Sequence, residues 1–195
     1  MLRAEGLAAF RGERLVFSGL SFAVSAGGAL VLAGPNGSGK STLLRVLAGL
    51  GRLEAGRLLW DGKDTLADLT EHARLVTYVG HQDAVKPGLT VAENFGFYAS
   101  LFGVPSARLP LALTDFADLP ARMLSAGQKR RLALSRLVIT QAPLWLLDEP
   151  TLGLDTAAIT RFGALLRAHR DRGGIVVVAT HIPLPLDDVA ELRLA

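Results

Sequence analysis

The chain has 195 residues, of which 50% are hydrophobic and 20% are charged, and its formal net charge is +3. No apolar run reaches the roughly 18 residues that span a bilayer, and no secretory leader opens the chain, so we expect a cytoplasmic protein. The absence of cysteine excludes disulfides and thiolate chemistry, and the dispersed charge argues against nucleic acid as a partner.

Apolar segments in the first part of the chain predict short strands around one helix. The helix is expected over 40–48, because its apolar residues recur on one face and Gly49 can close it. Strands are expected at 15–17, 20–24, 29–33, 58–63 and 75–79.

The pattern changes between residues 83 and 122. Pro87 and Gly88 break the chain, Thr90 can cap a helix that runs to Phe102, and segment 103–105 ends that helix. We interpret this part as a small helical insertion.

Strand–helix alternation resumes after the insertion. The expected elements are a helix over 125–138, a strand at 144–147, a helix over 156–170 and a strand at 175–179. Uniformly apolar strands alternating with helices predict an α/β fold with a parallel sheet covered on both faces. We therefore expect one domain over 1–195, with a core at 1–82 and 140–195 and an inserted helical subdomain at 83–139.

A motif of the form G-x-x-x-x-G-K-[ST] follows the strand at 29–33 and opens the next helix. Its glycines let the backbone wrap a polyphosphate and aim N–H groups inward. Lys40 offers a cation to the β- and γ-phosphates, and Ser41 offers a hydroxyl to Mg²⁺. An ordinary turn is the alternative, but the strand–loop–helix context favours ATP or another nucleotide. The residues expected to hold it are Gly34, Pro35, Asn36, Gly37, Ser38, Gly39, Lys40, Ser41 and Thr42.

Two carboxylates end the apolar strand at 144–147. Asp148 is expected at the carboxyl edge of the sheet beside the phosphate loop, where it can hold the water shell of Mg²⁺. Glu149 is expected to orient the attacking water or to act as general base. Two solvated acids after a core strand are the alternative.

Segment 124–131, Leu-Ser-Ala-Gly-Gln-Lys-Arg-Arg, resembles the signature motif of ATP-binding-cassette (ABC) ATPases, with alanine replacing the usual first glycine. The resemblance covers nearly the whole chain. It implies a P-loop NTPase cassette whose parallel core is flanked by an N-terminal antiparallel β subdomain and a small helical lobe. It also implies that Ser125, Gly127 and Gln128 contact the ATP of the opposite subunit, in a head-to-tail homodimer that sandwiches two ATP molecules.

Other residues match the remaining motifs of the family in order. By this resemblance, Gln82 ligates Mg²⁺ and links the chemistry to the helical lobe. Asp155 lies in the D-loop, and His181 is the switch histidine that contacts the γ-phosphate and Glu149. Phe10 takes the place of the aromatic residue that stacks on adenine, with a core position as the alternative.

Local stretches at 15–22, 43–50, 78–82 and 124–137 resemble the ATPase subunit of the cytochrome c maturation (haem exporter) system. That resemblance implies a peripheral protein on the inner face of the cell membrane. Its ATP hydrolysis would power transmembrane transporter subunits, and haem would be only an indirect ligand. The alternatives are another ABC transporter with unknown cargo, an ATP-dependent dimerisation module without transport, and a P-loop small-molecule kinase.

We expect no functional role for the remaining histidines or for the basic segment 129–131. His72 and His81 have no motif context. His169 lies at an arginine-rich helix end and is expected to be a solvated cation. Segment 129–131 is expected to be a solvated helix face rather than a nucleic-acid patch.

Overall fold

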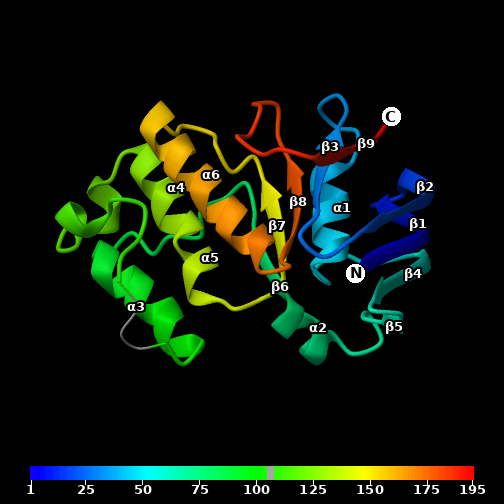
Figure 1. The fold of residues 1–195 in the computed structure, drawn as a ribbon, viewed down its shortest axis with the longest axis horizontal. Coiled ribbons are helices and arrows are strands. Elements are labelled where there is room, and N and C mark those ends of the chain that lie inside the picture. Colours follow the sequence, from blue (N-terminus) through cyan, green and yellow to red (C-terminus); the bar gives the residue numbers. More distant parts are fainter. Residues whose placement is uncertain (105–107) are drawn as a thin grey trace.

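A five-stranded parallel sheet and a four-stranded antiparallel sheet form the body of the molecule (Figure 1). The computed structural model describes residues 1–104 and 108–195. Across the parallel sheet the strands are β6 (Val76–Val79), β7 (Leu144–Asp148), β8 (Ile175–Ala179), β3 (Ala29–Ala33) and β9 (Val189–Arg193). Across the antiparallel sheet they are β2 (Arg14–Val24), β1 (Leu2–Arg11), β4 (Ala55–Trp60) and β5 (Lys63–Asp64).

The helices divide between the core and one end of the molecule. The core helices are α1 (Lys40–Leu47), α2 (Leu69–Leu75) and α6 (Thr156–Asp171), and at the end opposite the antiparallel sheet lie α3 (Val91–Leu101), α4 (Ala126–Leu134) and α5 (Arg136–Ile139) (Figure 1). Two short 3₁₀ helices span Thr114–Phe116 and Ala121–Met123. None of the helices in residues 1–104 and 108–195 has both the length and the apolar character to cross a membrane.

Both faces of the parallel sheet are covered, because alternate residues of its buried strands pack into two different clusters. Leu144 and Leu146 of β7 join a cluster with α1 and the antiparallel sheet. Trp145 and Leu147 point to the other face and pack with Phe162 and other residues of α6, α4 and α5. A strand buried on both sides has no polar alternation, which is why the sequence shows continuous apolar runs here. The α/β class, with a parallel core sheet and an N-terminal antiparallel sheet, is confirmed.

Several element predictions needed correction. The strands expected at 15–17 and 20–24 are one strand, β2, paired along its length with β1, which the sequence analysis did not predict. Two further elements were not predicted from the sequence, α2 and β9. Asp68 caps α2, and its side chain accepts hydrogen bonds from two main-chain N–H groups. The helix expected over 125–138 is two helices separated at Ser135, whose hydroxyl donates to the Leu132 carbonyl at 2.6 Å.

The segment predicted as an inserted helical subdomain contains most of a separate hydrophobic cluster. Phe95 on α3, Leu132 on α4 and Ile139 on α5 belong to this cluster. Thr90 caps α3 through a reciprocal pair of hydrogen bonds with Glu93, as its position suggested. Pro105, expected to follow the helix end, lies outside the described residues, and the boundaries at 83 and 139 stay a prediction.

His169 is buried, so its interpretation as a solvated cation is wrong. Its ring stacks on the indole of Trp145 with centroids 3.7 Å apart, and its Nε2 lies 3.3 Å from the Ile175 carbonyl oxygen. Burial lowers the pKa of His169 below the ordinary value of 6.5 and outweighs the opposing effect of that carbonyl. The folded protein therefore holds this histidine neutral.

The buried histidine predicts a loss of stability in mild acid. Protonation favours the unfolded chain, since its histidine has the higher pKa, so the free energy of unfolding should fall as the pH drops through 6.5. His169→Phe keeps an aromatic ring against Trp145 but binds no proton. Urea unfolding followed by tryptophan fluorescence between about pH 8 and about pH 5 should show a shallower pH dependence for this variant. Identical pH dependences would contradict the prediction.

Candidate functional site

The glycine-rich loop connects β3 to α1, and its backbone leaves the helix N-terminus open. Gly39, the residue before α1, has φ of 101°, and no side chain caps the helix there. A Cβ on Gly39 would collide with the Val16 side chain, and one on Gly34 (φ 140°) would collide with the Leu194 carbonyl oxygen. Only glycine fits these two positions. Because no side chain caps α1, free N–H groups and the positive end of the helix dipole face the cavity beyond the loop.

Lys40 lies folded against this loop. Its side chain is buried, and Nζ donates to the carbonyl oxygens of Gly34 at 2.7 Å and Pro35 at 3.0 Å. The buried hydroxyl of Ser38 has no hydrogen-bond partner within the described residues. An ammonium held only by carbonyl oxygens and an unpaired hydroxyl are groups that an anionic oxygen can satisfy.

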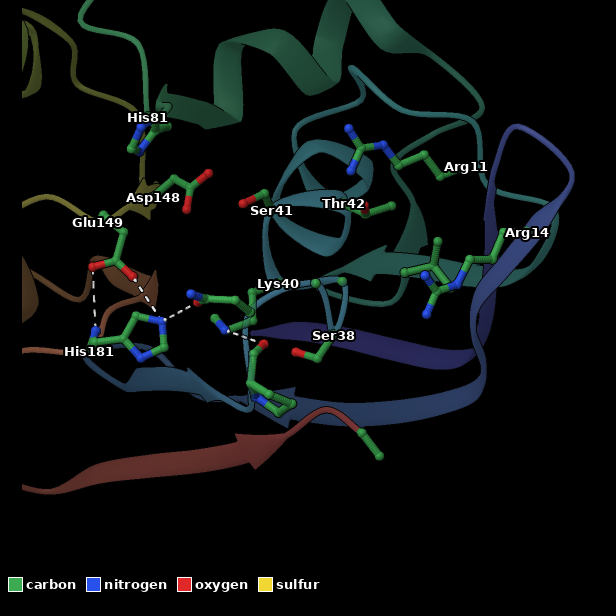
Figure 2. A pocket seen from close by; sticks show the side chains of 16 residues that line it. Arg11, Arg14, Ser38, Lys40, Ser41, Thr42, His81, Asp148, Glu149 and His181 are labelled. Atoms are coloured by element: carbon green, nitrogen blue, oxygen red, sulfur yellow. Dashed lines mark hydrogen bonds and ion pairs between the residues drawn. The ribbon is translucent and has the colours of Figure 1, made fainter.

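A cavity of about 580 Å³ opens over the loop (Figure 2). The loop residues from Pro35 to Thr42 line its middle, and Asp148, Glu149 and His181 line one end. The cavity is large enough for a nucleotide-sized ligand.

The catalytic candidates gather where β7 and β8 end. Asp148 is 5% exposed, and Glu149 adopts φ of 47°, a left-handed conformation that non-glycine residues rarely adopt. Glu149 Oε2 accepts a hydrogen bond from the His181 main-chain N–H at 3.3 Å, and the His181 ring lies 3.6 Å from Oε1. His181 Nε2 is also 3.0 Å from Asn36 Oδ1, so the histidine bridges the carboxylate and the phosphate loop. The carboxylate is thus oriented beside the place where a terminal phosphate would lie.

Ser41, Gln82 and Asp148, the predicted Mg²⁺ residues, all border a second, neighbouring cavity of about 940 Å³. Gln82 lies there rather than in the phosphate-loop cavity. Phe10 also lines this second cavity and is 47% exposed, which rules out the alternative of a core position. Phe10 does not line the phosphate-loop cavity.

The residues of the signature motif lie outside both cavities. Ser125 caps α4, where its hydroxyl accepts from the Gln128 N–H at 3.2 Å and Gln128 Oε1 accepts from the Ser125 N–H at 2.8 Å. Gly127 packs so closely on Gly153 that a Cβ would collide with its carbonyl oxygen. Asp155, the D-loop residue, caps α6 through the Ala158 N–H at 2.7 Å. The motif does not border the phosphate-loop cavity of its own chain, so its predicted contact with ATP requires a second chain.

Arg130 is 4% exposed, so the interpretation of 129–131 as a wholly solvated face is wrong. Its guanidinium donates five hydrogen bonds, one for every N–H group it has. Three go to consecutive carbonyl oxygens at the end of β7 and just beyond it: Asp148 (2.6 Å), Glu149 (2.9 Å) and Pro150 (3.1 Å). The other two go to the Gly80 carbonyl at 2.8 Å and Asp83 Oδ1 at 3.0 Å, on either side of Gln82. Arg130 thus connects the signature helix, the strained Glu149 backbone and the Gln82 segment.

Three residues with basic side chains that line the phosphate-loop cavity were not predicted from the sequence to be part of the site. These are His81, for which the sequence indicated no role, and Arg11 and Arg14 (Figure 2). His81 directly precedes Gln82 at the end of β6, a position that could have indicated its place at the sheet edge. The two arginines flank Gly12 and Glu13, and a turn there was the available signal.

The family model and the relatives that match this chain describe the same kind of protein. A family model described as ABC transporter matches residues 17–152. The cytochrome c biogenesis ATP-binding export protein CcmA of Gluconobacter oxydans (strain 621H) is 48% identical over 196 residues, covering 100% of this chain and 87% of the relative. The protein of the same name from Rhodospirillum rubrum is 52% identical, covering 97% of this chain and 84% of the relative.

Solved structures show the same relationship. The ATP-binding subunit of an ABC transporter superposes with a TM-score of 0.83 at 25% identity, covering 93% of this chain and 80% of the other. An ATP-binding cassette solved as a dimer in a post-hydrolysis state, bound to ADP and Pi, has a TM-score of 0.78 at 25% identity. That match covers 93% of this chain and 88% of the other.

Removing the Arg130 guanidinium should disrupt both stability and catalysis. Arg130→Ala leaves its buried acceptors unpaired, which should lower the free energy of unfolding by about 3–5 kcal/mol. Arg130→Lys keeps the charge with fewer donors and should fold, but with a lower kcat for nucleotide hydrolysis at an unchanged KM, because Glu149 is less well oriented. Arg131→Lys, on the same helix, is the control. An unchanged kcat in Arg130→Lys would contradict this positioning role.

Proposed function

Because this chain belongs to the ABC transporter family, among the cytochrome c biogenesis ATP-binding export proteins, we propose that its ATP hydrolysis powers haem export through a membrane complex. The observation that carries the enzymatic part is the phosphate-loop cavity, where Lys40, buried Asp148 and the Glu149–His181 pair meet. The proposed role in haem export is based on the names of the relatives.

Binding of the triphosphate begins at the loop. The free N–H groups at the start of α1 would receive phosphate oxygens, and Lys40 Nζ would exchange the Gly34 and Pro35 carbonyls for the β- and γ-phosphates. This exchange replaces neutral acceptors with charged ones, so it strengthens the hydrogen bonds of the ammonium.

The residues around Asp148 suit Mg²⁺. Ser41, Gln82 and Asp148 offer only oxygen donors, which this hard cation prefers. In residues 1–104 and 108–195 no cluster of three or more histidine or carboxylate side chains could hold a metal alone. Mg²⁺ is typically held by one or two carboxylates together with substrate phosphates, so these residues would hold it once ATP is bound. The cation would neutralise the charge that develops on the phosphates.

Glu149 would accept a hydrogen bond from the attacking water, and then its proton, as the oxygen adds to the γ-phosphorus and the bond to ADP breaks. His181 supports this role in two ways. Its main-chain N–H orients the Glu149 carboxylate, and its ring, now near Asn36, would donate to the γ-phosphate. A phosphoryl acceptor other than water would indicate the kinase alternative.

A homodimer would complete the site. Ser125, Gly127 and Gln128 stand at the exposed start of α4, away from the cavity of their own chain. In a head-to-tail pair, this helix N-terminus would face the γ-phosphate bound by the other subunit. The dimeric cassette bound to ADP and Pi, which shares this fold, supports the arrangement.

The partner in transport would be a transmembrane subunit, with this chain peripheral on the inner face of the membrane and haem handled indirectly. A strain lacking the gene and expressing Lys40→Ala should fail to attach haem to apocytochromes, whereas the natural chain should restore attachment. Restored cytochromes in the Lys40→Ala strain would contradict a role for its ATP hydrolysis.

Glu149→Gln should abolish turnover and preserve ATP binding. Loss of the general base should lower kcat by about 10²–10⁴-fold. The variant should therefore accumulate as an ATP-bound dimer, visible by light scattering on a sizing column with ATP. Glu191→Gln, an exposed acid on β9, is the matched control. Hydrolysis at the natural rate in Glu149→Gln would remove this residue from the mechanism.

Lys40→Ala should lose affinity for ATP. Removal of a charge-assisted hydrogen bond to phosphate costs about 1.5–3 kcal/mol, which corresponds to an increase in Kd of about 10- to 150-fold. Isothermal titration calorimetry measures this directly, with Lys63→Ala, an exposed lysine on β5, as the control. Equal affinities in the two variants would argue against the loop as the phosphate site.

A further inference from the structure

The connection between β8 and β9 follows an unusual path. Ala179 of β8 pairs with Leu32 of β3, and Val189 of β9 pairs with Ala29 of the same strand. Residues 180–188 therefore return from the carboxyl edge of the sheet to its amino edge. A helix usually makes such a crossing between parallel strands, but no residue of this connection is helical (Figure 1). We call residues 180–188 the strap.

Two arginines of α6 hold the second half of the strap. The guanidinium of Arg167 donates a hydrogen bond to the Pro185 carbonyl oxygen at 2.9 Å. The guanidinium of Arg170 donates to the carbonyl oxygens of Asp187 at 2.7 Å and Asp188 at 3.4 Å. Three of the last four carbonyls of the strap are thus bound by side chains of this helix.

Gly163, one turn before Arg167, lets the strap lie close to the helix. A Cβ at this position would collide with the ring of Pro185. Glycine inside a helix lowers its stability relative to alanine, so the buried Gly163 indicates that this close contact is needed. Gly163, Arg167 and Arg170 are spaced by four and three residues, which places them on one face of α6. We call these three residues the anchor.

The strap has little freedom between the anchor and its first residues. The hydroxyl of Thr180 accepts a hydrogen bond from the Ile182 N–H and donates one to the Ile182 carbonyl, each at 3.1 Å. The ring of Pro183 fixes its φ, and Leu184 packs against the hydrophobic cluster under α6. Because these residues are constrained, a displacement of the anchored half is transmitted to His181.

We propose that the anchor positions His181 for catalysis, a role that rests on the proposed ATPase function. The His181 main-chain N–H lies 3.3 Å from Glu149 Oε2, and its ring lies 3.0 Å from Asn36 Oδ1. The His181 side chain is 53% exposed, so close packing around the ring does not hold it, and its place depends on the backbone of the strap. None of the anchor residues lines the phosphate-loop cavity, so they are positioning residues.

A double variant, Arg167→Ala with Arg170→Ala, tests the proposal by steady-state kinetics on the full chain. The kcat for ATP hydrolysis should fall at least about 10-fold, because a displacement of about 1 Å can cost about 100-fold, whereas KM should stay within about twofold. Gly163→Ala keeps both arginines and should lower kcat in the same way, since it pushes Pro185 away from α6. Arg161→Ala, an exposed arginine on the same helix, is the control and should leave both values unchanged.

Amide hydrogen exchange followed by mass spectrometry tests the anchor without hydrolysis. In the double arginine variant, without nucleotide, peptides from residues 180–184 should exchange faster than in the natural chain, whereas peptides from residues 40–47 should exchange at the natural rate. An unchanged kcat, faster exchange confined to residues 185–188, or a rise in KM as large as the fall in kcat would overturn the proposal. A natural chain that does not hydrolyse ATP would instead refute the proposed function, and the exchange rates would still test the anchor.

Discussion

Three neighbouring parallel strands, β3, β7 and β8, end at one edge of the sheet, and this alignment places the phosphate loop, Glu149 and His181 beside one another. In the ladder Leu32 pairs with Ala179, and Ala179 pairs with Asp148. The residues that follow these strands therefore emerge side by side, although they are far apart in sequence. Polar groups cluster there because the strands themselves are buried on both faces and can carry only apolar side chains.

The buried side chain of Arg130 connects the segments at this edge of the sheet by hydrogen bonds. A buried guanidinium is costly unless each of its N–H groups is paired. Here three carbonyls at the end of β7 and just beyond it, together with the Gly80 carbonyl and Asp83, supply all the acceptors. The same bonds hold Glu149 in a left-handed backbone conformation and join it to the segment around Gln82. A movement of the helical lobe would thus reach Glu149 and Gln82 together.

Residues associated with both sheets line the phosphate-loop cavity. Asp148, Glu149 and His181 line one end of the cavity at the edge of the parallel sheet, whereas the antiparallel sheet contributes Arg11, Arg14 and Val16 at the far end. Because α1 packs between the sheets, its N-terminal loop meets both. In the proposed function, a nucleotide in this cavity would contact residues of both sheets.

The sequence by itself determined the α/β class, the phosphate loop, the two carboxylates at the end of β7 and the family, because these depend on local patterns: glycine spacing, apolar runs and contiguous motifs. The tertiary structure alone decided which dispersed residues meet. His169 read as a solvated cation because helix ends are commonly exposed, yet it is buried against Trp145. Arg130 read as solvated because its acceptors come from segments remote in sequence. Arg11 and Arg14 became visible as a pair only when the ladder of β1 and β2 set their register. Long-range packing and strand register, which no local pattern encodes, are the physical reason for each difference.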